Sequence, residues 1–388
     1  MQNQLRVIYL ANFFAGLSTV ASVVGTLYFL ANGISQAQIG QLAAVFMISM
    51  SIFNIPTGVF ADIVGHKASV VIGLFFHALN GLIFYLFPTF PGMVIGMLSA
   101  GLGLALQTGA WSSLTYEILE KENRVDKLAE VTGKAGAYFA MAAVIGSLFG
   151  SPIFKYSPKT PFLLFFICIS LAGIVATQIT YKKPIVKPTW IKLFTTTKDG
   201  IKFTLQNQRL TGLMIITIAL TTGRMMMNQN IAQPYQVSIG VDIAIIGVIA
   251  AIAQIIQMGV SAWAHKVAEK IGYDYSLIMT IIVPAVAVFL MGRISNLVGI
   301  GFLFIFGAAQ AFKEPIAGYL GQKAMISTHR ATMASTSSVM SSVIVGLLLP
   351  LGGKSIDLFG INYTLGILSV WILVIGGIGV AVYNAAKS

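Results

Sequence analysis

Long apolar runs alternate with short polar or charged breaks along almost the whole chain. Each run is long enough to cross a bilayer as a helix, because one crossing takes about 20 apolar residues. The breaks contain charged residues, Pro or Gly, and they divide the chain into twelve predicted spans. These spans cover residues 5–30, 37–60, 68–87, 92–118, 130–153, 161–181, 209–232, 241–264, 274–293, 296–323, 331–353 and 361–384.

The composition assigns the protein to the membrane. Of its 388 residues, 56% are hydrophobic and only 9% are charged, whereas soluble domains carry about 25% charged residues. We therefore expect an all-α integral membrane protein whose twelve transmembrane helices form two six-helix halves related by pseudo-two-fold symmetry. The first run is too long for a cleaved signal peptide, and eleven further runs follow it.

The positions of the basic residues predict the orientation. With the N-terminus inside, 18 of the 24 Lys and Arg fall on the inner side of the membrane. Such a bias is typical of cytoplasmic loops, so both termini are predicted to be cytoplasmic. The net charge of +12 therefore indicates topology and contact with an anionic lipid leaflet rather than nucleic-acid binding. Four basic residues fall outside, namely Lys155, Lys159, Arg293 and Lys354.

A long polar segment divides the chain into two halves. Residues 1–181 and 209–388 are the predicted six-helix bundles, and residues 182–208 are a cytoplasmic linker, either an interfacial helix or a solvated segment. The halves share short similarities, such as VFADIVGHK after the second span and WAHKVAEKIGY after the eighth. Repeats of this kind are common in transporters, whose binding site lies where the repeats meet.

The loop GVFADIVGHK concentrates charge between the second and third spans. Gly58 and Gly65 allow close helix approach and a tight reversal of the chain. The carboxylate of Asp62 is suited to the N-terminus of a helix, where the helix dipole stabilises negative charge. The loop is therefore a candidate contact between helices at the inner surface.

This loop resembles the signature loop of the major facilitator superfamily, which reads Gly-x-x-x-Asp-Arg/Lys-x-Gly-Arg-Arg/Lys. Four positions match, and Ile63 and His66 stand where the pattern has basic residues. RATMAS at 330–335 and KDGIKF at 198–203 are also similar to this family, and YEIL at 116–119 is similar to an efflux-like branch of it. The matching positions are Gly58, Asp62, Gly65 and Lys67.

The resemblance implies a cytoplasmic gate. Asp62 would dock on the N-terminus of the eleventh span, near residues 331–335, and latch the two halves together. His66 or Lys67 would pair with Glu117 at the end of the fourth span. The alternative is that these charges only anchor a loop at the membrane surface, where an exposed His is usually inert. The predicted gate residues are Gly58, Asp62, Gly65, His66, Lys67 and Glu117.

Three charged residues lie inside predicted spans: Arg224, Lys313 and Glu314. A charge at the centre of a membrane helix costs at least about 2.5–3.5 kcal/mol on insertion scales, so such residues usually serve function. The resemblance places the first, fourth, seventh and tenth spans around a central cavity, and these three residues are on the seventh and tenth. Pro315 is expected to bend or break the tenth span beside Glu314.

Glu314 is the candidate proton site, with Arg224 and Lys313 as its partners in coupling. Burial disfavours the ionised carboxylate, and a neighbouring cation favours it. Competition between a proton and the substrate for this carboxylate would give antiport. The alternative is a permanent ion pair with Lys313 or Arg224 that holds helices together.

Polar, aromatic and Met side chains on the cavity spans form the candidate substrate site. Gln107 and Trp111 are expected to share a helix face at i,i+4, as are Arg224 and Asn228. Flexible Met and an aromatic ring suit loosely specified apolar ligands. The predicted substrate-binding residues are Asn12, Gln107, Trp111, Arg224, Met227, Asn228 and Glu314.

The predicted function is secondary transport by alternating access, as proton-coupled efflux of a small amphipathic compound. GSLFGSP at 146–152 resembles the antiporter signature Gly-x-x-x-Gly-Pro through Gly146 and Gly150, although such glycines also serve ordinary packing. The alternatives are proton-coupled symport of a sugar or metabolite, and a receptor or assembly factor that transports nothing. No enzyme motif, metal-ligand cluster or cofactor motif is found, so we expect no enzyme, cofactor or metal. The expected partners are the substrate, H⁺ and lipid, in a monomer of a prokaryotic inner membrane.

Overall fold

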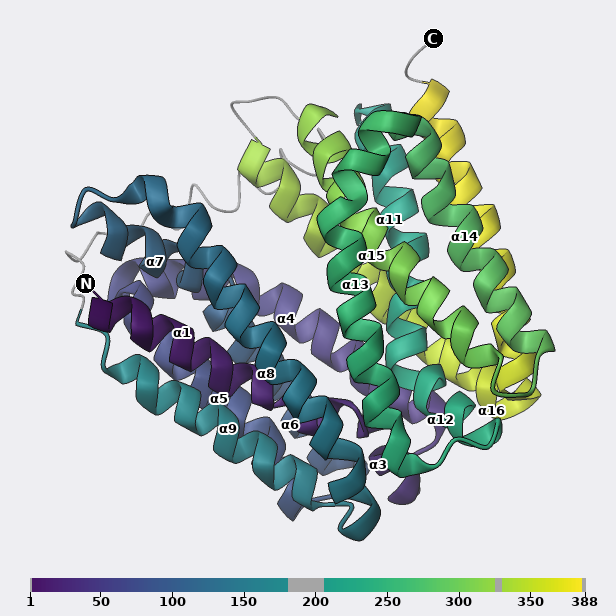
Figure 1. Ribbon diagram of the computed structural model, residues 1–388, viewed down its shortest axis with the longest axis horizontal. Helices are drawn as coiled ribbons and strands as arrows, with labels where there is room; N and C mark the ends of the chain where they lie inside the picture. The colour runs from purple at the N-terminus through teal and green to yellow at the C-terminus, as the bar shows by residue number, and fades with distance from the viewer. Residues whose placement is uncertain (1, 181–205, 325–329, 386–388) are drawn as a thin grey trace. The chain divides into compact units, whose positions relative to one another are not determined.

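The computed structural model of the protein describes residues 2–180, 206–324 and 330–385 (Figure 1). Every regular element in these ranges is a helix. Eleven helical stretches are long and apolar enough to cross a membrane. The last, Ser337–Ala385, runs through Gly360, whose backbone angles (φ 80°, ψ 170°) are not helical, so two spans meet there. The predicted fold class, an all-helical membrane protein with twelve spans, is therefore confirmed.

The chain forms two compact units, and the first contains most of the first half. In this unit α1 packs on α8, and α5 packs on α6 and α9 (Figure 1). Its helices are α1 (Gln2–Leu17), α2 (Thr19–Ser22), α3 (Gly25–Ala31), most of α4 (Gln36–Val64), α5 (His66–Leu86), α6 (Phe90–Gln107), α7 (Ala110–Glu120), the 3₁₀ turn η1 (Val125–Lys127), α8 (Leu128–Tyr156) and α9 (Thr160–Thr177).

The second unit contains most of the second half. In it, α16 packs on α11 and α14, and α14 packs on α15. The predicted linker at 182–208 lies almost wholly outside the described residues, so its interfacial helix stays a prediction. The helices of this unit are α11 (Gln208–Met226), the π turn η2 (Met227–Ile231), α12 (Ala232–Ser238), most of α13 (Ile243–Ile271), α14 (Tyr273–Arg293), α15 (Gly299–Ala324) and α16 (Arg330–Ala385).

The starts of α4 and α13 do not group with their own halves. Residues Ser35–Ala44 belong to the second unit, and Ile243–Ala251 belong to the first. Close packing explains both cases. A Cβ on Gly40 would collide with the backbone of Leu349 in α16, and one on Gly247 would collide with the carbonyl of Ser147 in α8. Gly40 and Gly247 are equivalent positions of the internal repeat, 207 residues apart.

The same repeat is visible in the backbone. Gly33 and Gly240, and likewise Gly65 and Gly272, are also 207 positions apart, and all four have positive φ. Gly65 (φ 94°, ψ 146°) precedes α5, and Gly272 (φ 91°, ψ 142°) precedes α14. Residues with a side chain rarely adopt this conformation, so Gly is needed at both reversals. The sequence similarity between the two loops therefore corresponds to a shared chain reversal.

Three predicted spans are interrupted helices. The first span comprises α1, α2 and α3, and the seventh passes from α11 through the π turn η2 into α12. The fourth span breaks between α6 and α7, where Thr108 is extended and Gly109 has φ 77°. By contrast, α15 continues through Pro315, so the helix is not broken beside Glu314, and a bend there stays a prediction. Membrane helices tolerate Pro where neighbouring groups satisfy the freed backbone.

The glycines of the fifth span serve packing against the first span. A Cβ on Gly146 would lie 2.6 Å from the carbonyl oxygen of Leu17, and one on Gly150 would collide with the carbonyl of Val20. Small residues at such positions let membrane helices approach closely. The resemblance of GSLFGSP to an antiporter signature therefore has a structural explanation that needs no transport direction.

Candidate functional site

A buried lysine and an exposed glutamate form the charged centre of α15. Lys313 Nζ lies 3.0 Å from Glu314 Oε1, and the two side chains are 4% and 58% exposed. Successive helical residues are about 100° apart, so the pair cannot point in one direction. The ion pair with Lys313, which the sequence left as an alternative to a proton site, is thus present. Ionisable groups inside spans face the bundle interior or water-filled cavities, so we expect the open side of this carboxylate to face water.

Arg224 supplies a second cation from the adjacent helix α11. Gln310 Nε2 donates to the carbonyl oxygen of Leu220 at 3.3 Å and so ties α15 to α11 one turn from both cations. The charge of Arg224 acts on Lys313. Arg224 Nε is buried and has no hydrogen-bond partner in the described part of the chain. No direct Arg224–Glu314 ion pair is found among the described residues, where Glu314 pairs with Lys313.

The π turn changes the residues that follow Arg224. Helical spacing of 100° per residue does not hold through η2, because its hydrogen bonds run from i to i+5. Asn228 is exposed, as a ligand contact requires. Met227 is only 1% exposed and packs in the interior. Almost none of its side chain is accessible in this conformation, and its contact with substrate stays a prediction.

A carboxylate caps the start of α4 in the same unit. Asp357 Oδ1 accepts from Gln36 N at 3.0 Å, and its Oδ2 accepts from Ala37 N at 2.8 Å. Asn230, in the π turn, donates from Nδ2 to both the carbonyl and the side-chain oxygen of Gln36, each at 2.9 Å. The first N–H groups of a helix have no partner within it, so Asp357 satisfies two of them. This contact joins α16, η2 and α4 near the predicted outer surface, and it was not predicted from the sequence.

The predicted substrate residues of the first half bond mainly to their own helices. Asn12 Nδ2 donates to the carbonyl oxygen of Ile8 at 2.9 Å, and Gln107 Nε2 donates to that of Gly103 at 3.0 Å. The break between α6 and α7 separates Gln107 from Trp111, so the shared i,i+4 face is wrong. All these side chains are half-buried. A role in substrate binding stays a prediction for them.

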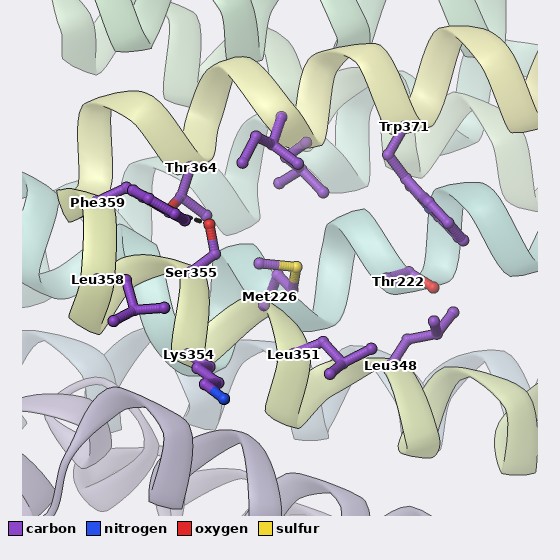
Figure 2. Close-up of a pocket in the computed structure, with 13 residues that line it drawn as sticks. Thr222, Met226, Leu348, Leu351, Lys354, Ser355, Leu358, Phe359, Thr364 and Trp371 are labelled. Carbon is purple, nitrogen blue, oxygen red and sulfur yellow. Dashed lines mark hydrogen bonds between the residues drawn. The ribbon is translucent and has the colours of Figure 1, made fainter.

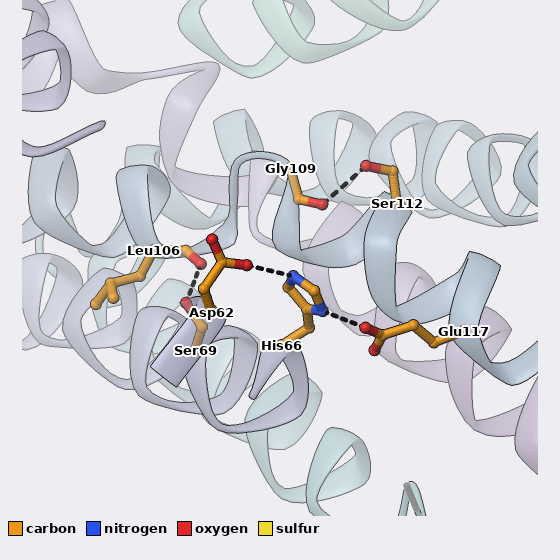
Figure 3. Close-up of polar contacts among 7 residues, drawn as sticks. All are labelled: Asp62, His66, Ser69, Leu106, Gly109, Ser112 and Glu117. Atoms are coloured by element: carbon orange, nitrogen blue, oxygen red, sulfur yellow. Dashed lines mark hydrogen bonds and ion pairs between the residues drawn. The ribbon is translucent and has the colours of Figure 1, made fainter. Parts of the chain in front are cut away.

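The inner loop of the first unit holds a buried His–Glu pair (Figure 3). His66 Nδ1 lies 2.9 Å from Glu117 Oε1, and each side chain is 10% exposed. His66 Nε2 lies 3.9 Å from Asp62 Oδ1, on the exposed side. His66 begins α5 and is buried, so the expectation of an exposed loop His is wrong. The imidazole instead links α5 to α7 and to the end of α4, while Ser69 Oγ donates to the carbonyl oxygen of Leu106 in α6 at 2.7 Å.

The other predicted gate residues differ in their surroundings. A Cβ on Gly58 would meet no heavy atom within 4 Å, so the expected close helix approach at this glycine is wrong here. Gly65 provides the tight reversal, as predicted from its position. Lys67 is half-buried, and the contact with Glu117 is made by His66 instead. The predicted docking partner of Asp62 is at 331–335, whose side chains lie outside the described residues. A gating role stays a prediction.

The family follows from comparison with known sequences. The profile of the Major Facilitator Superfamily matches residues 8–350. The chain belongs to the major facilitator superfamily. The resemblance carried by the signature loop is confirmed, whereas the match does not specify an efflux branch.

Several curated proteins are similar to this superfamily member. YajR of Escherichia coli (strain K12), an inner membrane transport protein, is 28% identical over 133 residues, or 34% of this chain and 29% of YajR. The MFS-type transporter MJ1560 of Methanocaldococcus jannaschii is 26% identical, over 47% of this chain and 46% of MJ1560. The chain thus spans less than half the length of these two relatives. YxaM of Bacillus subtilis (strain 168), an MFS-type transporter, is 22% identical over 85% of both chains.

Solved transporters share the fold. A mutant of the nucleoside transporter NupG superimposes with a TM-score of 0.84 at 14% identity, over 98% of this chain and 100% of NupG. A POT family transporter in complex with 5-aminolevulinic acid superimposes with a TM-score of 0.75 at 12% identity, over 99% of this chain and 96% of the other. At this identity the likeness establishes the fold alone.

An apolar pocket of this superfamily member lies between α11 and both parts of α16 (Figure 2). Its volume is about 360 Å³, and Thr222, Met226 and Trp371 are among its lining residues. None of the predicted substrate residues lines it. Arg224 is about 200° around the helix from Thr222, so it faces away from this pocket. A substrate site usually adds several convergent polar groups to its apolar walls. Here Lys354, Ser355 and Thr364 of α16 line the pocket together with Thr222 of α11.

A second, more polar pocket of about 310 Å³ lies at the predicted inner end of the same unit. Arg209, Asp274 and Lys323 are among its lining residues. Tyr273 and Tyr319 stack at its edge, with ring centroids 4.2 Å apart. The sequence did not predict a site at these residues. Their meeting depends on the packing of α11, α14, α15 and α16, which no local pattern indicates.

Proposed function

We propose that this transporter is a proton-coupled secondary transporter of a small amphipathic organic compound, with its polar site on α11 and α15. One observation carries the proposal: an open carboxylate, Glu314, is paired at 3.0 Å with the buried Lys313 beside Arg224, whose buried Nε has no hydrogen-bond partner among the described residues. Charge at this depth is costly and is kept where it binds ligands or ions. Asn228, exposed one turn beyond Arg224, adds a hydrogen-bonding group to the same site.

Alternating access supplies the mechanism. Two repeated halves that rock about a fixed site expose it first to one side of the membrane and then to the other. Asn12, Gln107 and Trp111 are the first-half residues that we propose to complete the site. On the inner side, the His66–Glu117 pair and Asp62 would hold the gate. The interrupted first, fourth and seventh spans supply the deformable segments that such a motion requires.

Glu314 is the group that we propose to carry the proton. Protonation removes the negative charge that holds Lys313, so the ammonium becomes available to another anion. The direction of coupling then depends on the substrate. A cationic substrate competes with the proton for Glu314, which gives antiport and efflux, the form predicted from the sequence. An anionic substrate binds the freed cations together with the proton, which gives symport.

The charge balance favours symport over efflux. Two cations face one carboxylate in this cluster, so a cation is repelled more than it is attracted. The glycines of the fifth span, which suggested an antiporter, serve helix packing. We therefore propose uptake by symport as the function that the geometry supports best, and retain proton-coupled efflux as the second candidate.

Orientation follows the distribution of basic residues. We propose that both termini are cytoplasmic, because 18 Lys and Arg fall on one side and four on the other. We further propose a prokaryotic inner membrane, where the similar protein YajR is described as an inner membrane transport protein.

The test uses purified protein in liposomes that contain a pH-sensitive dye. Organic acids, lipophilic cations, drugs and sugars are added outside in turn, with no preset gradient. Symport acidifies the lumen and antiport makes it alkaline, so the sign of the change separates the two candidates. Glu314→Gln should abolish the change, whereas Glu269→Gln, which removes an exposed acid at a helix end, should leave it intact. A full proton flux in Glu314→Gln would remove the proton role of this residue.

A further inference from the structure

We propose that the substrate carries a negative charge, which Arg224 and Lys313 bind, and that it crosses the membrane together with the proton on Glu314. This inference rests on the proposed function and specifies the substrate class of the same site. It goes beyond the family, which does not determine the charge of a substrate.

The cluster has an excess of positive charge. Lys313 Nζ is 3.0 Å from Glu314 Oε1, and this pair is neutral as a whole while both are ionised. Arg224 adds one positive charge, and its buried Nε has no hydrogen-bond partner in the described part of the chain. The net charge is therefore +1 with Glu314 ionised and +2 with Glu314 protonated. A cationic substrate would be disfavoured in both states.

No other described group in the neighbourhood reverses this balance. α15 packs mainly on α11 and α14, and its Gly307 also meets Gln257 of α13. The titratable residues of α13 lie in its last turns, and they are His265, Lys266, Glu269 and Lys270. Besides Arg224, the only charged residue of α11 is Arg209 at its inner end. The titratable side chains of α14 all lie near its two ends, and they are Tyr273, Asp274, Tyr275 and Arg293. Glu314 is thus the single carboxylate near the two cations, among the residues described.

Exposure explains how an anion would reach these cations. The carboxylate of Glu314 is the open member of the pair, and the ammonium of Lys313 lies behind it. An incoming anion meets Glu314 first and is repelled while that group is ionised. Protonation removes the repulsion and frees the ammonium. The guanidinium of Arg224 presents planar N–H donors suited to a carboxylate or phosphate, and its buried Nε–H has no acceptor in the described part of the chain.

Linkage fixes the consequence for transport. If protonation of Glu314 raises the affinity for the anion by some factor, the bound anion raises the affinity for the proton by the same factor. Proton and anion bind together and leave together, which makes them cosubstrates in one direction. For a monovalent anion and one proton, the net charge moved is zero.

A charge-sensing reaction tests this without knowledge of the substrate. Cys168 is the only cysteine, so Cys168→Ser gives a background in which Asn228→Cys places a thiol one turn from Arg224. The thiol is treated with two methanethiosulfonates of similar size, one bearing a sulfonate and the other a trimethylammonium group. The ratio of their rates reports the local potential, because the intrinsic reactivity of the thiol cancels. Ser295→Cys, at an exposed connection, is the reference position.

The expected results differ for each charge. Arg224→Gln should lower the anion-to-cation ratio at position 228 about sevenfold in low salt, for a unit charge roughly 7 Å away in water. Glu314→Gln should raise the ratio, and the ratio with Glu314 present should rise as the pH falls, whereas it should stay flat in Glu314→Gln. Glu269→Gln should change nothing, and Arg224→Gln should leave the ratio at Ser295→Cys unchanged.

Two results would overturn the inference: a faster reaction with the cationic reagent at position 228, or a ratio that Arg224→Gln does not change. A ratio that is independent of pH with Glu314 present would refute the shared binding of proton and anion. The liposome assay and the labelling assay can refute different parts of the proposal. Expected ratios with no proton flux would refute proton-coupled transport alone, whereas proton flux with a cation-favouring ratio would refute the anionic substrate alone.

Discussion

The two glycines of the signature loop should respond in opposite ways to substitution by alanine. Gly58 lies inside α4 with helical geometry, and an added Cβ would have free space around it. Alanine in a helix interior is more stable than glycine by about 0.5–1 kcal/mol, so Gly58→Ala should stabilise the protein by that amount. Gly65 has φ 94° and ψ 146°, where a side chain costs about 1–3 kcal/mol. Gly65→Ala should therefore destabilise it.

The separation between the two variants is then about 1.5–4 kcal/mol. At about 2–4 °C per kcal/mol for a unit of 150–250 residues, this corresponds to at least several degrees of apparent melting temperature. Both variants are measured in the same detergent at the same heating rate, with Gly272→Ala as a second case of the Gly65 conformation (φ 91°). Equal losses for Gly58→Ala and Gly65→Ala would refute the reasoning, because both glycines would then serve close packing.

The remaining predictions concern the two polar contacts. Glu117→Gln removes the charged partner of the buried His66 and should reduce the free energy of unfolding by about 1.5–3 kcal/mol, the value of a hydrogen bond to a charged group. Its apparent melting temperature should fall below that of the control Glu120→Gln, at the exposed end of the same helix, and equal melting temperatures would contradict the prediction. Asp357→Ala leaves two N–H groups of α4 without their cap and should lower the free energy of unfolding by about 1 kcal/mol, whereas Asp357→Asn should lose less. Amide hydrogen exchange at Gln36 and Ala37 should be faster in Asp357→Ala, and an unchanged rate would contradict the cap.

The twelve spans could be predicted because each is a long apolar run with its own local signal. The reversal at Gly65 and the contact between His66 and Glu117 were anticipated for a different reason. A glycine followed by charged residues marks a chain reversal locally, and the family resemblance supplied the partner across 51 positions. Both patterns can be recognised in a single sequence without an alignment.

Interruptions inside the spans could not be predicted, because they break the assumption of uniform helical spacing. Thr108 and Gly109 interrupt the fourth span within an apolar run that shows no boundary. The π turn after Met226 has the same effect in the seventh span. Pro315 is the opposite case, since a residue that often ends helices lies inside the continuous helix α15. Exposure of Glu314 and burial of Lys313 depend on which face of α15 meets its neighbours, and that is a property of packing.

The cap on α4 can form only late in the synthesis of the chain. Asp357 and Gln36 are 321 positions apart. At about 5–20 residues per second, the ribosome needs about 16–64 s to reach Asp357 after Gln36 has been added. During that time the first N–H groups of α4 have no carboxylate to accept their hydrogen bonds, so the start of the second span remains uncapped. A first half produced alone would remain permanently in that state. A split version of the protein should therefore need its second half to complete the start of the second span.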